Sequence, residues 1–277
     1  MFSRLPGFLA VLVVSFMTFQ QATQAAPKAE LWDRWLAHEA GSTISVDHSE
    51  WDRLLKTYVF DRGDGVNRVA YDHINADDAA RLEAYLKRLS ETPVSRLDRP
   101  AQLAFWFNLY NALTVKVILD HYPVDSIRDI DISPGLFADG PWGKKLIAVE
   151  GVEVSLDDVE HRILRPIWRD PRIHYGVNCA SYGCPNLLRQ AFTAQNVDTL
   201  LTKGAKAYIN SPRGARFDGE KLVVSKIYDW FEEDFGSSEE GVIAHLLLFA
   251  NPDLKRRLAD VAGIYDYEYD WSLNSLP

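Results

Sequence analysis

The sequence predicts an α+β fold that is mostly helical with a small central antiparallel sheet. Apolar residues recur with helical spacing towards both ends of the chain, whereas the middle contains short alternating segments with turn residues between them. This grouping of helices around a few strands is typical of one α+β domain. The 277 residues, 47% of them hydrophobic, are enough to bury a full core.

The first residues have the layout of a secretory signal peptide. Arg4 precedes an apolar stretch at 8–19, and a small polar tail leads to a cleavage position expected after Ala25. The apolar stretch is short for a transmembrane helix, and no other long apolar run follows. We therefore expect residues 1–25 to be removed and residues 27–277 to form a single domain. That domain is expected to be exported, periplasmic or secreted, without membrane insertion.

The net charge of −9 argues against general nucleic-acid binding, which needs a basic surface to neutralise phosphates. No Gly-rich phosphate loop follows any predicted strand, so no nucleotide or other cofactor is predicted. The expected partner is a peptide, a small envelope-derived substrate or another protein.

The first half of the chain is predicted to be helical. A helix at 49–60 has Ser49 as a plausible N-cap. The helix at 99–123 is apolar nearly all round, so we expect it to be the buried central helix. The other two predicted helices lie at 31–41 and at 76–92, where Pro93 ends the second one.

The middle of the chain begins with a hairpin at 145–155 around Glu150-Gly151. The helix that follows at 156–165 is opened by Ser155 with Asp158 three residues on, and we expect it to stop at Pro166. The remaining predicted elements are a strand at 172–178, a helix at 196–211, a hairpin at 215–225, and helices at 228–236 and 240–261.

Both cysteines of the chain, Cys179 and Cys184, lie in the segment DPRIHYGVNCASYGCPNLLRQ, with four residues between them. In an oxidising compartment such a pair often forms a disulfide, and a tight turn can bring the two residues close enough. A metal site would need two further ligands, and no second pair of neighbouring Cys or His residues is present. The third possibility is that Cys179 is a nucleophile.

A nucleophilic cysteine needs a neighbouring base or cation, because the thiolate is the reactive form. Cys179 has the parity of the apolar residues in the predicted strand 172–178, whereas His174 has the opposite parity and is expected at the solvent side or rim. His161, beside Glu160 at the edge of an apolar helix stripe, is the better candidate base. The alternative is that these two residues belong to a solvated helix face.

Two amides stand out in the apolar helix 99–123. Asn108 and Asn111 are three positions apart, so they project to the same side. Buried amides must be hydrogen-bonded. One possibility is that they bind a neighbouring loop or strand end. The other is that one of them orients the base or lines an oxyanion pocket.

Four blocks of this sequence occur in the order found in one protein family: LAFWFNLYNALTVKVIL, GPWGKKLIAVEGVEVSLDDVEHRILR, DPRIHYGVNCASYGCPNL and YDWFEEDFG. Over roughly residues 95–236 the chain resembles the domain of unknown function 547 (DUF547) family, in particular its exported bacterial members. The family pattern has an Asn-Cys pair at the position of Asn178-Cys179 and an Ile/Val-Glu-His run ending at the position of His161.

The resemblance has consequences for both cysteines. Many relatives have serine at the position of Cys184, which implies that the role of Cys179 does not depend on a disulfide. A Cys with a His and an acid or amide is also the constellation of papain-like and transglutaminase-like enzymes, here in a different chain order. A rearranged architecture of that kind is expected by analogy. Plant relatives carry the domain behind a coiled-coil segment and are discussed as partners of other proteins.

Two functions therefore remain open. The first is a cysteine-dependent hydrolase or acyl transferase that acts on amide or ester bonds, with Cys179 as nucleophile, His161 as base, and Asn178 or loop N–H groups holding the oxyanion. The second is a non-enzymatic binding or scaffold module with a structural Cys179–Cys184 pair. The candidate catalytic residues are Cys179, His161, Glu160, Asn108 and Asn111; the groove candidates are Asn178, Trp106, Trp142, Tyr182 and Trp230.

Overall fold

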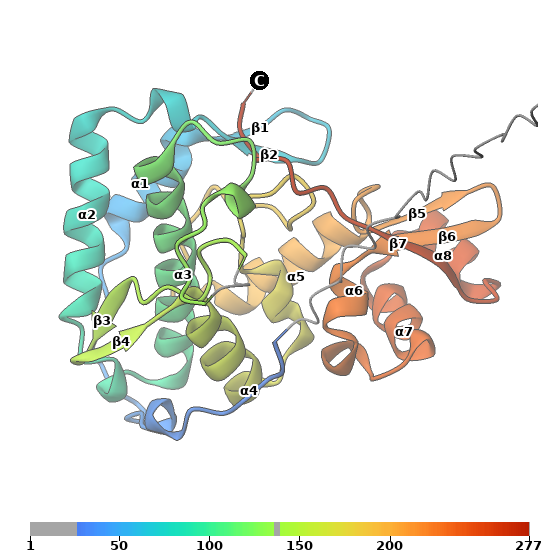
Figure 1. Ribbon diagram of the computed structural model, residues 1–277. Coiled ribbons are helices and arrows are strands. Elements are labelled where there is room, and N and C mark those ends of the chain that lie inside the picture. The colour runs from blue at the N-terminus through green and yellow to red at the C-terminus, as the bar shows by residue number, and fades with distance from the viewer. Residues whose placement is uncertain (1–26, 136–138, 277) are drawn as a thin grey trace, which may run out of the picture.

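The computed structural model describes residues 27–135 and 139–276 (Figure 1). The predicted leader lies outside the described residues. The α+β prediction is confirmed, because helices dominate and the strands form small sheets. None of the helices in the described part of the chain is long and apolar enough to cross a membrane.

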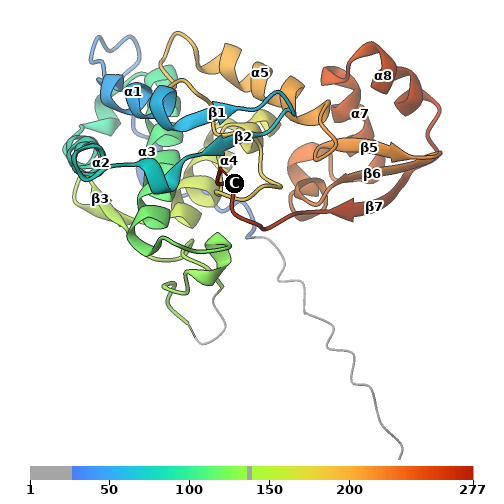
Figure 2. The same ribbon diagram turned by 90° about the horizontal axis from the view of Figure 1, so that it is seen from above.

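Three helices pack together on one side of the molecule (Figures 1 and 2). They are α1 (Ser49–Tyr58), α2 (Ala76–Ser90) and α3 (Arg99–His121). The side chain of Asp98 caps α3 by accepting a hydrogen bond from the Ala101 N–H, which explains why this helix begins after Asp98. The predicted central position of α3 is confirmed, since its apolar side chains are buried around most of its circumference. The predicted helix at 31–41 is reduced to a 3₁₀ turn at Asp33–Leu36.

In the described residues, the strands form three separate sheets rather than one central sheet. Two of the sheets are antiparallel hairpins, and the third combines an antiparallel pair with a parallel strand. The hairpins predicted at 145–155 and 215–225 are confirmed, whereas β1, β2 and β7 were not predicted. The bounds are β1 (Val59–Asp61), β2 (Asn67–Val69), β3 (Ile147–Val149), β4 (Val152–Val154), β5 (Ala215–Asp218), β6 (Lys221–Ser225) and β7 (Ile264–Glu268).

The second half of the chain builds a smaller apolar cluster against the β5–β6–β7 sheet. Figure 2 shows this sheet with its helices opposite the α1–α3 group. Its helices are α5 (Val197–Ile209), α6 (Ile227–Trp230), α7 (Glu239–Phe249) and α8 (Pro252–Ala259). Short 3₁₀ turns lie at Tyr71–His73, Val94–Arg96, Ile127–Asp129 and Glu232–Phe235.

The strand predicted at 172–178 is wrong. The segment Pro171–Tyr175 is a 3₁₀ helix, opened by the Asp170 side chain, which accepts a hydrogen bond from the Arg172 N–H. Ile173, His174 and Tyr175 are all buried, so the polar and apolar residues of this segment do not separate two faces. The alternation of polar and apolar residues in this segment therefore did not indicate a strand.

The helix predicted at 156–165 exists, but it does not stop at Pro166. The Ser155 and Asp158 side chains cap its start reciprocally, as predicted. Asp158–Leu164 then forms a π-helix, and α4 (Arg165–Trp168) continues it through Pro166. A proline lacks the N–H that a helix needs. Main-chain N–H groups of the N-terminal segment instead bond to the carbonyl oxygens of residues 161 and 162, so these two acceptors are paired.

Candidate functional site

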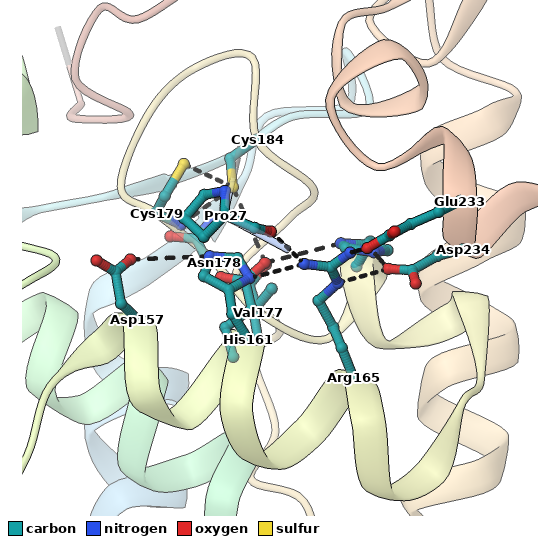
Figure 3. A network of polar contacts seen from close by, with 12 residues as sticks. Pro27, Asp157, His161, Arg165, Val177, Asn178, Cys179, Cys184, Glu233 and Asp234 are labelled. Carbon is teal, nitrogen blue, oxygen red and sulfur yellow. Dashed lines mark hydrogen bonds and ion pairs between the residues drawn. The ribbon is translucent and has the colours of Figure 1, made fainter. Parts of the chain in front are cut away.

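A cavity of about 840 Å³ lies where the cysteine loop, the π-helix and the C-terminal segment meet. Both cysteines line this cavity, as do Asp157, Glu160 and His161. Figure 3 shows the two sulfur atoms on one side of the helix that carries Asp157 and His161. The structure thus brings the predicted nucleophile, base and acid to the same cavity.

The two cysteines are free thiols that touch one another. Their sulfur atoms are 3.0 Å apart, and the Cys179 N–H donates to the sulfur of Cys184. The sulfur of Cys179 also lies 3.2 Å from the Ser181 hydroxyl and 3.1 Å from the Tyr269 hydroxyl. Three donors therefore surround one sulfur atom at the cavity wall.

The surroundings of the two thiols separate their acidities. Burial raises the pKa of Cys179, but hydrogen bonds from Cys184, Ser181 and Tyr269 outweigh it and bring the pKa below its usual value of 9.0. Burial and the neighbouring Cys179 raise the pKa of Cys184 well above that value. The arrangement stabilises a thiolate on Cys179 and keeps the proton on Cys184.

The cysteine loop is held in a strained conformation by a dense set of hydrogen bonds. Ala180 has a left-handed φ of 59°, which is costly for a residue with a Cβ. The Asn178 amide donates to the Pro185 carbonyl at 2.7 Å and accepts from the Ala180 N–H at 3.0 Å. Arg213 donates to the carbonyls of Tyr182 and Cys184. Asn178 thus positions the loop.

Most N–H groups of this loop already have partners. The Cys179 N–H donates to sulfur, and the Ala180 N–H donates to Asn178. The N–H groups of Tyr182 and Gly183 donate to carbonyl oxygens of the C-terminal segment at 2.6 and 2.7 Å. These paired N–H groups are not free to hold an oxyanion at Cys179, which favours a donor from another element of the cavity.

Glu160, His161 and His174 are buried, with 7%, 6% and 2% of their surfaces exposed. A solvated helix face for Glu160 and His161 is therefore wrong, as is a solvent-side position for His174. The N-terminal segment covers this part of the helix, since the Glu30 N–H bonds to the His161 carbonyl. The 3₁₀ turn at 171–175 directs His174 inward, where its ring stacks on Phe231 at 4.4 Å between centroids.

The hydrogen bonds of His161 fix its tautomer. The Arg165 guanidinium lies 3.1 Å from Nδ1 and can only donate, so Nδ1 accepts and the proton of the neutral ring is on Nε2. Nε2 lies 3.7 Å from the Asp157 carboxylate. Burial and the neighbouring Arg165 and His174 hold the pKa of His161 well below its usual value of 6.5. The ring is thus a neutral hydrogen-bond donor on its Nε2 side.

Arg165 is the centre of a buried polar network (Figure 3). Besides His161, it bonds to Glu233 at 2.7 Å, to Asp234 at 2.6 Å and to the carbonyl of Pro27 at 2.7 Å. Asp234 also bonds to Nε2 of His174 at 2.7 Å. Burial opposes ionisation of Asp234, but the bonds from His174 and Arg165 prevail and lower its pKa to about 2.

The pKa values of two carboxyl groups at the cavity are raised, in contrast to that of Asp234. Burial raises the pKa of Glu160 to about 7, although Arg165 partly opposes it. Burial and the adjacent Asp158 raise the pKa of Asp157 to about 6. A thiol and two carboxyls that exchange protons around neutral pH, all on one cavity, form the kind of cluster found at catalytic sites.

The remaining predicted residues lie outside the reactive cluster. Asn108 and Asn111 each hold main-chain groups of neighbouring loops. Trp106 is 1% exposed and packs edge-on against Trp35 in the core, and Tyr182 lies under the guanidinium of Arg213. Of the predicted tryptophans, Trp142 and Trp230 line the cavity.

Sequence reasoning missed the C-terminal contribution to the site. Tyr269 and Trp271 line the cavity and form an aromatic wall with Trp142 and Trp230, with neighbouring ring centroids 4.7–5.8 Å apart. The alternating aromatic residues Tyr265, Tyr267 and Tyr269 were the available signal for a strand that ends here.

In the described part of the chain, no group of three or more His, Cys, Asp and Glu residues is arranged to hold a metal ion.

Residues 94–209 match the family model described as "Protein of unknown function, DUF547". Over this segment the chain is similar to DUF547. The resemblance seen in the sequence is thereby confirmed over residues 94–209, which contain α3, the π-helix and both cysteines, whereas the block at 228–236 lies outside the match. No curated protein and no solved structure matches the chain.

Proposed function

We propose that the protein is a cysteine-dependent hydrolase or acyl transferase that acts on amide or ester bonds, with Cys179 as nucleophile. The observation that carries this proposal is the sulfur of Cys179, which lines the cavity and has within 3.2 Å three groups that can donate hydrogen bonds to a thiolate. Such donors favour the thiolate, which is the attacking form.

The reaction begins when the Cys179 thiolate attacks the carbonyl carbon of the substrate. The tetrahedral intermediate collapses to a thioester on Cys179, and the leaving group takes a proton. Water or an acceptor then attacks the thioester, and the thiolate leaves. Glu160 is the best candidate to give and retake the proton, since a carboxyl with a pKa of about 7 is present in both forms at neutral pH.

His161 then has a different role from the general base expected from the sequence. Its Nδ1 lone pair is occupied by Arg165, and its Nε2–H is available on the other side of the ring. We assign this N–H to the developing oxyanion, because most loop N–H groups near Cys179 already have partners. A neutral imidazole whose tautomer is fixed by a neighbour can act in this way.

The aromatic wall supports a peptide or envelope-derived substrate. Trp230, Tyr269 and Trp271 form a continuous apolar surface that ends at the Cys179 sulfur through the Tyr269 hydroxyl. Flat or aliphatic groups next to the scissile carbonyl would pack on this surface. We also propose that the predicted leader directs the protein to the periplasm or the medium. Intact mass measurement of the protein from each cell fraction would test cleavage after Ala25.

The experiment is acylation of the reduced protein by activated esters, such as p-nitrophenyl acyl esters, read by intact mass and peptide mapping. We expect a thioester on Cys179 in the wild type and none in Cys179→Ala, with turnover reduced on the order of 10⁴-fold or more. His161→Ala should slow acylation without abolishing it. Thermal melting of each variant would confirm folding. The absence of any acyl adduct on Cys179 would refute the proposal.

One observation favours the second candidate, a binding or scaffold module. The loop around Cys179 is so fully hydrogen-bonded that it resembles a structural element. In that case iodoacetamide should modify Cys179 no faster than an ordinary thiol with a pKa of about 8.5. Under the enzyme proposal, the alkylation rate should already be high below pH 8 and should fall when Tyr269 is changed to Phe.

A further inference from the structure

We propose a second activity of this cavity, thiol–disulfide exchange, in which Cys179 attacks a substrate disulfide and Cys184 resolves the mixed disulfide. This proposal goes beyond acyl transfer, because it needs no carbonyl substrate and gives Cys184 a chemical role. It takes a disulfide-containing peptide or a small organic disulfide as its substrate, and a low-molecular-weight thiol as the reductant for turnover.

The first support is the geometry of the two sulfurs. They are 3.0 Å apart across one short loop, and a disulfide requires about 2.0 Å. The loop is anchored on both sides of the pair, by the Asn178 amide before it and by Arg213 on the Cys184 carbonyl. The sulfurs can therefore bond with only a small movement of the side chains.

The second support is the asymmetry between the two thiols. The sulfur of the partly exposed Cys179 lies within 3.2 Å of the Ser181 and Tyr269 hydroxyls and of the Cys184 sulfur, whereas Cys184 is 5% exposed. When Cys179 is a thiolate it can only accept, so these three groups then donate to it. Exchange needs one thiolate to attack and a second thiol that stays protonated until the mixed disulfide has formed. The charge on Cys179 keeps the Cys184 proton in place, and that charge disappears when Cys179 becomes part of a mixed disulfide.

The third support is access. Both cysteines line a cavity of about 840 Å³, so a substrate disulfide can approach the pair from this side. The aromatic wall that includes Trp230 and Trp271 can pack against the apolar parts of a peptide disulfide.

The reaction balances in two displacements. The Cys179 thiolate attacks one sulfur of the substrate, the substrate S–S bond breaks, and the first thiolate leaves and takes a proton. Cys184 then loses its proton and attacks the Cys179 sulfur, and the second substrate thiolate leaves. The products are two substrate thiols and a Cys179–Cys184 disulfide, so the two electrons that reduce the substrate come from the cysteine pair. Two molecules of a small thiol such as glutathione return the pair to its reduced form.

The test uses the reduced full-length protein and the aromatic disulfide 5,5′-dithiobis(2-nitrobenzoate), with release of the thionitrobenzoate followed by absorbance and the protein by intact mass. The wild type should release two thiolates per chain, retain no adduct and become lighter by two hydrogens. Cys184→Ser should release one thiolate and retain the mixed disulfide on Cys179. Cys179→Ser should react at least about tenfold more slowly than Cys184→Ser at pH 7.

A stable adduct on Cys179 in the wild type would overturn the proposal, because it would show that Cys184 does not resolve. Equal reaction rates of Cys179→Ser and Cys184→Ser would also overturn it. Melting curves of both variants establish that they are folded. Acylation of the reduced wild type by an ester probe is measured in a separate experiment. A negative result there refutes acyl transfer alone, and a negative result with the disulfide refutes exchange alone.

Discussion

α3 and the π-helix Asp158–Leu164 both bury polar side chains, but they use them differently. In α3, the Asn111 amide donates to the Gly176 carbonyl and accepts from the Asn178 N–H, both at 2.9 Å. In the π-helix, the Glu160 carboxylate lies 3.7 Å from Nδ1 of His174, which is too long for a hydrogen bond. The amide is paired with main-chain groups, whereas the carboxyl remains turned to the cavity.

The comparison distinguishes buried polar groups that stabilise the fold from buried groups that can exchange protons. A buried amide with matched main-chain partners contributes stability and has no proton to exchange. Burial of the Glu160 carboxyl outweighs its interactions with Arg165 and the Tyr110 hydroxyl, so ionising it costs stability and its pKa rises to about 7. Substitutions in the two groups should therefore have different effects, and the network around Arg165 that holds the π-helix should be the most sensitive.

The largest expected effect is that of Arg165→Met. Removing the guanidinium leaves Asp234 and Glu233 without their buried partner, and we expect a loss of about 3–5 kcal/mol in unfolding free energy. Urea unfolding measures it. The matched control is Arg256→Met, whose partner Asp253 is highly exposed, so its loss should stay below about 1 kcal/mol. Equal losses in the two variants would contradict the role given to the network.

Asn111→Ala should cost about 2–4 kcal/mol, because it leaves the Gly176 carbonyl and the Asn178 N–H buried without partners. Asn210 is the control, since it also bridges two main-chain groups, the Phe249 carbonyl and the Asn251 N–H, but at a partly exposed position. Asn210→Ala should cost about 1 kcal/mol or less. Thermal and urea unfolding of both variants would show whether burial sets the difference.

Glu160→Gln should change the pH dependence of stability rather than lower stability at every pH. The folded protein binds the Glu160 proton more tightly than the unfolded chain, because the pKa rises from 4.5 to about 7 on folding. The contribution of this group to stability is therefore greatest below about pH 4.5 and falls as the pH rises towards 7.

Removing the carboxyl should flatten that fall, so the variant should gain about 2–3 kcal/mol relative to the wild type between pH 5 and pH 8. Urea unfolding at a series of pH values measures the difference. A parallel pH dependence in the two proteins would show that Glu160 is not a buried carboxyl with a raised pKa. Loss of acylation in this otherwise stable variant would connect the carboxyl to the reaction.

The sequence alone predicted the elements in which one pattern dominates. α2 and α3 have long apolar periodicity and clear ends, and the hairpin β3–β4 has a turn at Glu150-Gly151. The strand predicted at 172–178 was wrong, because residues that are buried on all sides show no polar face that would reveal the secondary structure. The continuation through Pro166 could not be predicted either, since the groups that pair with the freed carbonyls come from residues 30 and 32.

The residues of the site could be predicted only where residue type and neighbouring sequence were enough to identify them. Cys179, Glu160 and His161 were identified from residue type and helix position, and they share the cavity. The tautomer of His161 depends on Arg165 and the donor to Cys179 depends on Tyr269, which are tertiary contacts. Asn108 and Asn111 hold loops in place, one of the two possibilities left open for buried amides.

The position of Tyr269 has a consequence for the timing of reactivity. Its hydroxyl reaches Cys179 across 90 positions of sequence, and the adjoining residues 270–274 hold the cysteine loop through main-chain bonds. Contacts of such long separation form late in folding. Until they form, Cys179 has the acidity of an ordinary thiol and is mostly protonated at neutral pH. Under the proposed function, the newly made chain therefore has a cysteine of ordinary reactivity, and the completed fold activates it.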